Sequence, residues 1–296
     1  PLLIVHFSNQ FDTFGGWTWA GAIVSAIFVG ATLFSVLGMR ERKEFSVVDK
    51  PLPLMASFKA ALTNRSWITY IGASIMTDCM VDWLSMFVFF FVTISLGMTE
   101  ESLSIMMGVE MIAMFAFFLI WRRICSRYGT KVTLAVSMVA FCVGTLPAVL
   151  WGNGIVGACI MGLMAGLTLG GLVLSMALMS ADVIDEDEIK TGVRREGMYS
   201  GVAAPIGQID PIVVGTGSAF LLTSIGFVSG RAAKDQPPSV GPGIRLGMVV
   251  FPAIFTAIML IFLKFYPLGK KRVEEVGKEI EKMHAEKAKK LEEMKA

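Results

Sequence analysis

The sequence predicts an all-α membrane protein with seven spanning helices. Hydrophobic residues make up 54% of the 296 residues and charged residues only 17%, whereas soluble domains average about 25% charged residues. The apolar residues gather into seven segments, each near or above the roughly 20 residues that a helix needs to cross the hydrocarbon core. The expected spans are 17–38, 67–96, 103–121, 132–151, 155–181, 198–228 and 244–266.

Residues 1–16 are expected to form an external loop that enters the first span. The connection 39–66 is long and basic, and its second half, Leu52–Asn64, carries apolar residues at helical spacing. This pattern is typical of an amphipathic helix on the inner membrane surface, and a plain linker helix fits it equally well. Asn64 is expected to mark the start of the next span, with Trp67 at the interface.

The lysines and arginines predict the orientation of the chain. The segments 39–66, 122–131, 182–197 and the tail from Lys264 onward hold 23 of the 26 basic residues. Because loops rich in lysine and arginine stay on the cytoplasmic side, these segments are placed inside. We therefore expect a multi-pass protein of the cell membrane with a cytoplasmic C-terminus. The charged tail, 267–296, is expected to form a solvated helix.

The order of spans and loops predicts the domain organisation. One span, a long basic inner loop and six further spans are what a twelve-span major facilitator transporter leaves when it is cut before its sixth span. On this interpretation, 1–38 holds an external loop and the last helix of the N-terminal half. The inter-half loop is 39–66, the C-terminal six-helix bundle is 67–266, and the missing N-terminal half is an expected partner.

Two spans carry residues that indicate how they pack. Gly162, Gly166 and Gly170 recur every four residues in 155–181, so they share one helix face and allow close approach of a neighbouring helix. The span 198–228 contains Pro205 and Pro211, which predict a kinked helix.

Charged residues inside the apolar segments are the candidate binding groups. Asp78 and Asp82 lie about 16–22 Å along their span, near mid-bilayer, and at i and i+4 they share a face. Two carboxylates at this depth favour a bound proton, cation or basic partner, although acids that only bond neighbouring helices give the same pattern. The expected substrate and cation set is Asp78, Asp82, Trp83, Asp210 and Glu110, with Trp83 stacking on a sugar face.

The segment 182–197 holds six acids and three bases, which cannot lie in hydrocarbon. Opposite charges so close in sequence predict a network of ion pairs at a helix mouth, and such a network favours a gate. The basic turn 122–131 is either an ordinary inner anchor or a second part of that gate. The expected gate residues are Asp182, Asp185, Lys190, Arg194, Glu196, Arg122, Arg123 and Arg127.

The run Asp182-x-x-Asp185…Lys190-Thr191-Gly192-x-Arg194-x-Glu196-Gly197, followed by Tyr199-Ser200, resembles the loop between helices ten and eleven of the glycoside–pentoside–hexuronide:cation symporters. That melibiose-permease-like family belongs to the major facilitator superfamily. The resemblance implies that Asp182 and Asp185 pair with Arg194, together with Arg122 or Arg123, in a cytoplasmic lock. The family's own sugar- and cation-binding acids lie largely on helices of the first half, which this sequence does not contain.

Three functions are compatible with these observations. The first is sodium- or proton-coupled symport of a sugar or glycoside, the second is transport of lipid or lysolipid, and the third is a membrane sensor or scaffold without transport. The segregated charges argue against a nucleic-acid partner. The cysteines lack metal or disulfide spacing, and His6 and His284 stand alone, so neither an enzyme, a metal site nor a cofactor is expected.

Overall fold

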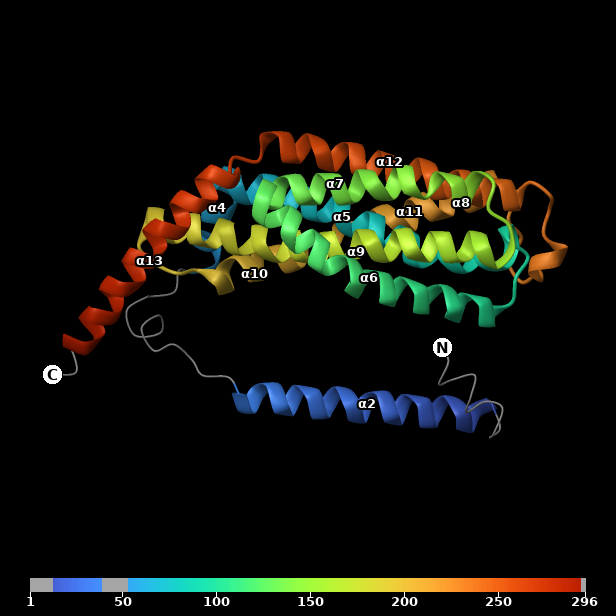
Figure 1. Cartoon of the computed structure of the whole chain (residues 1–296), viewed down its shortest axis with the longest axis horizontal. Coiled ribbons are helices and arrows are strands. Elements are labelled where there is room, and N and C mark those ends of the chain that lie inside the picture. Colours follow the sequence, from blue (N-terminus) through green and yellow to red (C-terminus); the bar gives the residue numbers. More distant parts are fainter. Residues whose placement is uncertain (1–12, 39–52, 294–296) are drawn as a thin grey trace. The chain divides into compact units, whose positions relative to one another are not determined.

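The computed structural model describes residues 13–38 and 53–293 (Figure 1). The chain divides into two compact units, Pro1–Val48 and Asp49–Ala296. The described part of the first unit is the helix α2 (Thr13–Gly38), and the apolar side chains with described burial in it are almost all exposed. The expected external loop up to residue 12 and the basic stretch 39–52 lie outside the described residues.

All regular elements in the described part of the second unit are helical. They are α4 (Leu54–Thr63), α5 (Arg65–Phe90) with the π-helix η1 (Phe91–Ser95), α6 (Glu100–Tyr128), α7 (Thr130–Gly144), α8 (Leu146–Leu150), α9 (Gly154–Thr191), α10 (Glu196–Ile206), α11 (Ile209–Ser224), the 3-10 helix η2 (Ala233–Asp235), α12 (Val240–Phe265) and α13 (Lys270–Glu293). With α2 included, seven of the described segments are long and apolar enough to cross a membrane.

The seven expected spans are therefore confirmed, with three changes at their boundaries. The span expected at 132–151 is split into α7 and α8 at Thr145, just before Pro147. The span expected at 198–228 is split into α10 and α11 around Gly207, after Pro205, so the predicted break is present. The third change is larger, because α9 continues to Thr191. The acidic part of the predicted loop is thus the last turns of a helix.

Local sequence explains where α5 begins. The side chain of Asn64 accepts hydrogen bonds from the backbone N–H groups of Ser66 and Trp67, as an N-cap does. The helix expected before it is present as α4, which packs against α5 and α10. Trp67 lies in the first turn of α5 and is buried beside Tyr199 at a ring separation of 6.0 Å, and its expected place at the membrane interface stays a prediction.

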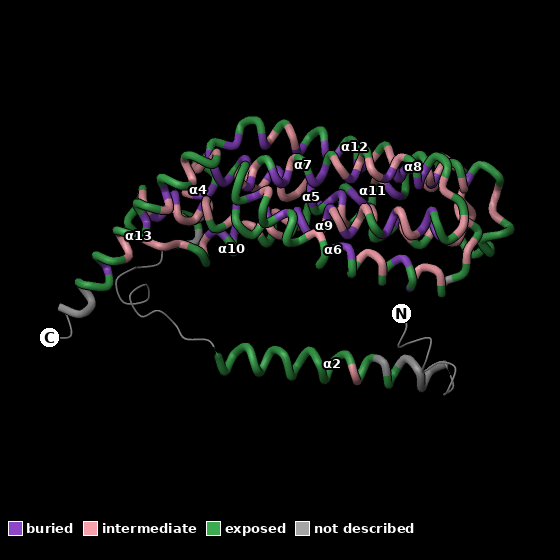
Figure 2. The backbone as a smooth tube through the Cα atoms, in the orientation of Figure 1, coloured by how far each residue is buried: buried purple, intermediate pink, exposed green. Residues whose placement is uncertain are grey.

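The core lies along the inward sides of α5, α7, α9 and α12 (Figure 2). The indole of Trp83 stacks between the rings of Phe87 and Phe251, with centroids 4.4 and 3.9 Å away. By contrast, α6 carries exposed apolar side chains along much of its length, as a lipid-facing helix does.

Glycine permits the close packing of α6 on α9. A Cβ at Gly162 would lie 2.5 Å from the carbonyl oxygen of Met106, and one at Gly166 would collide with the carbonyl oxygen of Glu110. Gly170 lies against α6 less tightly, since a Cβ there would lie 3.1 Å from the carbonyl oxygen of Met114. The predicted role of this glycine face in helix packing is confirmed.

Candidate functional site

Three carboxyl groups converge on one face of the second unit. Asp78 and Asp82 lie one turn apart on α5 and are exposed, whereas Asp210, in the first turn of α11, is buried. The carboxyl of Asp210 is within hydrogen-bonding reach of Asp82. Ser74 donates a hydrogen bond to Asp78 at 3.2 Å. No lysine or arginine of the described residues forms an ion pair with any of the three.

A cavity of about 390 Å³ opens beside this acid face, between α5, α9 and α10. Its wall combines apolar side chains with aromatic rings, hydroxyl groups and one carboxylate. The principal members are Trp67, Tyr70, Ser74, Asp78, Ser180 and Tyr199. The hydroxyl of Tyr199 is held in place because it accepts a hydrogen bond from Nδ2 of Asn64 at 2.8 Å. Flat apolar rings beside hydroxyls and one carboxylate are suited to a ligand with both C–H faces and hydroxyl groups.

Trp83 does not belong to this cavity, and the expectation that it stacks on a sugar is wrong. Its side chain is 0% exposed, and aromatic rings cover its indole. Its Nε1–H donates to the carbonyl oxygen of Gly247 at 3.2 Å, which satisfies the indole's one donor. Trp67 and Tyr70 line the cavity instead. Sequence reasoning missed them because it weighed only the aromatic residue adjacent to Asp82.

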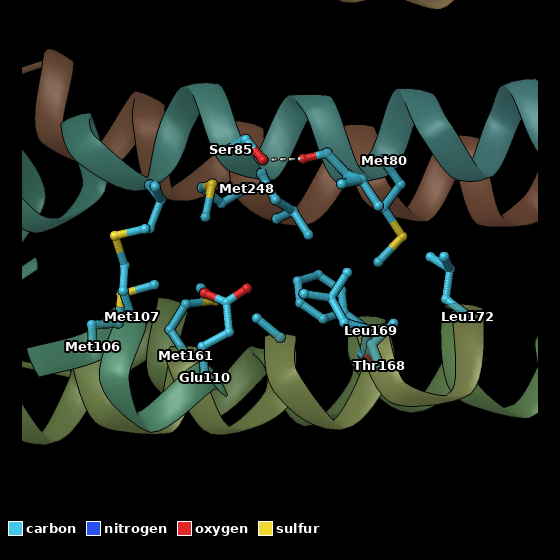
Figure 3. Close-up of a pocket in the computed structure, with 15 residues that line it drawn as sticks. Met80, Ser85, Met106, Met107, Glu110, Met161, Thr168, Leu169, Leu172 and Met248 are labelled. Carbon is cyan, nitrogen blue, oxygen red and sulfur yellow. Dashed lines mark hydrogen bonds between the residues drawn. The ribbon is translucent and has the colours of Figure 1, made fainter. Parts of the chain in front are cut away.

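Glu110 lies apart from the acid face. It points from α6 into a second, mostly apolar cavity between α5, α6 and α9 (Figure 3). The residues that line the second cavity do not include Asp78, Asp82 or Asp210. The expected single set of binding acids is therefore divided between two places.

The predicted ion-pair network lies where α9 ends, beside α13; we call this the α13 end of the bundle (Figure 1). Arg194 lies 2.9 Å from Asp185, 2.9 Å from Glu188 and 2.6 Å from Glu196. Burial alone lowers the pKa of Arg194, but the hydrogen bonds to these carboxylates outweigh it and hold that pKa above its usual range. Lys190 pairs with Glu186 at 2.8 Å, one turn earlier on the helix.

The sequence missed the centre of this network. Glu188 has a fully buried side chain and is contacted by Arg194, by Nζ of Lys287 at 2.9 Å and by Nε2 of His284 at 3.1 Å. His284 is thus not alone. Arg195 forms two hydrogen bonds with Asp187, at 2.6 and 2.8 Å. In the sequence, the only sign that α13 takes part in this network was the spacing of His284 and Lys287, which lie three residues apart on one helix face.

The remaining gate residues are placed differently from the expectation. Arg194 reaches Asp185 and Glu188 rather than Asp182, and Oδ2 of Asp182 is buried without a hydrogen-bond partner in the described residues. The hydroxyl of Tyr266 is likewise buried and unpartnered there. Burial, and then the nearby charge of Asp182, raise the pKa of Tyr266.

The basic turn between α6 and α7 takes no acid partner from the network. The guanidinium of Arg127 lies 5.5 Å from the ring of Tyr128. The backbone carbonyl of Arg127 accepts a hydrogen bond from Nζ of Lys270 at 3.0 Å. Arg122 and Arg123 are exposed, and neither forms an ion pair within the described residues. In this structure the turn contacts the start of α13 instead.

Comparison with known proteins gives consistent matches. A family model described as "MFS/sugar transport protein" matches residues 1–270. The isoprimeverose transporter of Lactiplantibacillus pentosus is 24% identical over 97% of this chain and 59% of its own length. A glucuronide carrier protein homolog of Escherichia coli is 29% identical over 36% of this chain and 22% of its own length. The sodium-dependent lysophosphatidylcholine symporter 1 of Gallus gallus is 20% identical over 96% of this chain and 54% of its own length. The chain spans a little over half the length of the relatives that it matches from end to end.

Proposed function

Because this chain belongs to the MFS/sugar transport protein family, we propose that the complete protein is a secondary transporter of a sugar or glycoside. The observation that carries the proposal is the meeting of two features at Asp78. That carboxylate belongs both to the acid face of α5 and to the wall of the aromatic, hydroxyl-lined cavity. A solute in the cavity and an ion at the acid face would therefore share one residue.

In this proposal the cavity recognises the solute. The ring of Tyr70 covers a C–H face of a sugar, while Ser74, Asp78 and Ser180 exchange hydrogen bonds with its hydroxyl groups. A carboxylate is a strong acceptor, and its hydrogen bonds with neutral donors stabilise binding by roughly 1.5–3 kcal/mol. Removal of its charge is expected to weaken solute binding by about tenfold or more.

The neighbouring pair Asp82 and Asp210 would couple transport to an ion. Two carboxyl groups within hydrogen-bonding reach cannot both stay ionised cheaply at mid-membrane depth, so one site of the pair holds a proton or a sodium ion. Binding and release of that ion change the charge beside Asp78, and hence the affinity for the solute. Asp78 and Asp82 are exposed on this face. We therefore include the acid face in the proposed contact with the other half of the transporter.

Alternating access would use the ion pairs at the α13 end as a gate. The positive-inside pattern of the lysines and arginines supports a cytoplasmic location for this end and for the C-terminus. There the network joins α9 to α13, and it begins at Asp185, directly after the cavity-lining residues Val183 and Ile184. The break between α10 and α11 at Gly207 gives this half a natural bending point.

The test is uptake by membrane vesicles that contain the complete protein. Asp78→Asn is expected to raise the solute concentration needed for half-maximal uptake, whereas Asp82→Asn and Asp210→Asn are expected to abolish the dependence on a sodium or pH gradient. Asp235→Asn, on the exposed helix η2, is the matched control and is expected to match the parent. Retention of both gradient dependence and affinity in all three acid variants would remove these acids from the site.

A lysolipid is the second candidate solute, since the chain also resembles lysophosphatidylcholine symporters along most of its length. Labelled glycosides and a labelled lysophospholipid, offered separately to the same vesicles, distinguish the two. Uptake of only the lysolipid would replace the sugar proposal. Uptake of neither, together with a protein bound to α13, would favour a sensor or scaffold.

A further inference from the structure

The second cavity encloses about 180 Å³ and has one charged group (Figure 3). Its wall carries the side chains of five methionines, Met80, Met106, Met107, Met161 and Met248, which come from α5, α6, α9 and α12. Apolar cavities near ~150 Å³ stay dry and accept molecules the size of benzene. Methionine side chains are flexible and polarisable, so their walls adapt to ligands of irregular shape. This place is thus large enough for a small organic molecule.

Glu110 is the only charged side chain among the residues that line this cavity. Figure 3 shows its carboxylate projecting from α6 into the space that faces Ser85 of α5. The hydroxyl of Ser85 donates to the carbonyl of Val81 at 2.9 Å and so is not donating to Glu110. None of the described residues forms an ion pair or hydrogen bond with the carboxylate of Glu110. A half-buried carboxylate against apolar walls gains free energy from any cation that reaches it.

The cavity restricts which cation fits. A hard metal ion such as Na⁺, Mg²⁺ or Ca²⁺ requires several oxygen ligands, and here a single carboxylate and two hydroxyls stand among methionine, leucine and valine side chains. A neutral apolar molecule would fill the space but leave the carboxylate without a counter-ion. A positively charged nitrogen with short apolar substituents satisfies both requirements, and the ring of Phe141 in the wall adds a surface that attracts such cations.

We propose that this cavity is a binding site for a small lipophilic ammonium ion, with Glu110 as the counter-ion and the methionines as an adaptable apolar wall. This site is separate from the cavity between α5, α9 and α10, and the proposal does not rest on the proposed transport function. Occupation would place a ligand between α5 and the α6–α9 pair, where it would hold these helices apart.

Binding to the complete protein in lipid nanodiscs tests the proposal. The probe is phenyltrimethylammonium, and its neutral carbon isostere, tert-butylbenzene, has nearly the same shape without the charge. The parent protein is expected to bind the ammonium at least about tenfold more tightly than the isostere. Glu110→Gln is expected to remove this preference and leave binding of the isostere unchanged. Glu101→Gln, on the first turn of the same helix and outside the cavity, is the matched control.

A second variant locates the site. Ala165 lines the cavity on α9, and Ala165→Leu is expected to fill part of the space and weaken both probes. Nuclear magnetic resonance of 13C-methyl methionine in the parent protein is an independent readout, with shifts of the cavity methionines expected on addition of the ammonium. The proposal is overturned if the two probes bind equally to the parent, if Glu110→Gln keeps the preference, or if the methionine signals do not move.

Discussion

Lys287 donates a hydrogen bond from Nζ to Oε1 of Glu188 at 2.9 Å, which joins the terminal helix α13 to the end of α9. One turn earlier on α13, Nε2 of His284 lies 3.1 Å from the other oxygen of the same carboxylate. Arg194 shares that oxygen at 2.9 Å. A single fully buried carboxylate therefore joins two segments about 100 residues apart in sequence.

Loss of this charge is expected to release α13. Glu188→Gln leaves two cationic side chains, Arg194 and Lys287, largely buried without their shared anion, which costs roughly 1–3 kcal/mol. Hydrogen exchange of the α13 backbone is expected to accelerate, and thermal unfolding to begin at a lower temperature. The control is Glu196→Gln, because Glu196 is 58% exposed and its ion pair is screened by water. Equal exchange in the two variants would show that Glu188 does not hold the helix.

The two acids of the Asp-x-x-Asp motif are expected to differ. Asp185 pairs with Arg194, whereas Asp182 has a buried oxygen without a partner in the described residues. Asp185→Asn is expected to weaken the gate and raise the labelling of a cysteine introduced at Ser180, in a background without the native cysteines. Asp182→Asn removes a charge that has no basic partner, so labelling is expected to stay at the parent level. A larger increase for Asp182→Asn would reverse this assignment.

Trp83 is expected to matter for stability and not for the solute. Trp83→Ala removes the central ring of the Phe87–Trp83–Phe251 stack and is expected to cost about 3–5 kcal/mol of unfolding free energy. Protein that still folds is expected to bind solute with the parent affinity. Tyr70→Leu, in the cavity wall, is the contrasting variant and is expected to lower solute affinity with a smaller effect on unfolding. Solute binding and thermal unfolding, measured on both variants, separate the two roles.

Two glycine substitutions, one at the contact between α6 and α9 and one away from it, are expected to change the stability of the protein in opposite directions. Gly166→Ala places a methyl group against the carbonyl oxygen of Glu110 and is expected to destabilise the protein by about 1–3 kcal/mol. Gly108→Ala, on α6, meets no heavy atom within 4 Å, and the better helix propensity of alanine is expected to stabilise by roughly 0.5–1 kcal/mol. The unfolding temperatures of the two variants test both expected effects on stability. An unchanged unfolding temperature for Gly166→Ala would show that the two helices can move apart at no cost in stability.

Part of the site was accessible from the sequence because it depends on spacing along one helix. Asp78 and Asp82 are four residues apart, so any α-helix places them on one face, and the depth of both follows from the distance to the start of the span. The pairing of Arg194 with Asp185 is likewise local, since only a short turn separates them. The role of Trp83 as a core residue could not be predicted from the sequence. Its position next to Asp82 does not show which way the indole points unless the neighbouring helices are known.

The sequence by itself determined the number of spans, the approximate ends of most of them, the helix break near Pro205 and the glycine face of α9. These features follow from hydrophobic length, backbone chemistry and the period of one helix, all of which act over a few neighbouring residues. Only the tertiary structure decided that α11 brings Asp210 to Asp82, that α13 brings Lys287 and His284 to Glu188, and that Glu110 faces a cavity of its own. The reason is physical: these groups meet through the packing of whole helices, and packing depends on the combined shape of many side chains rather than on any local pattern.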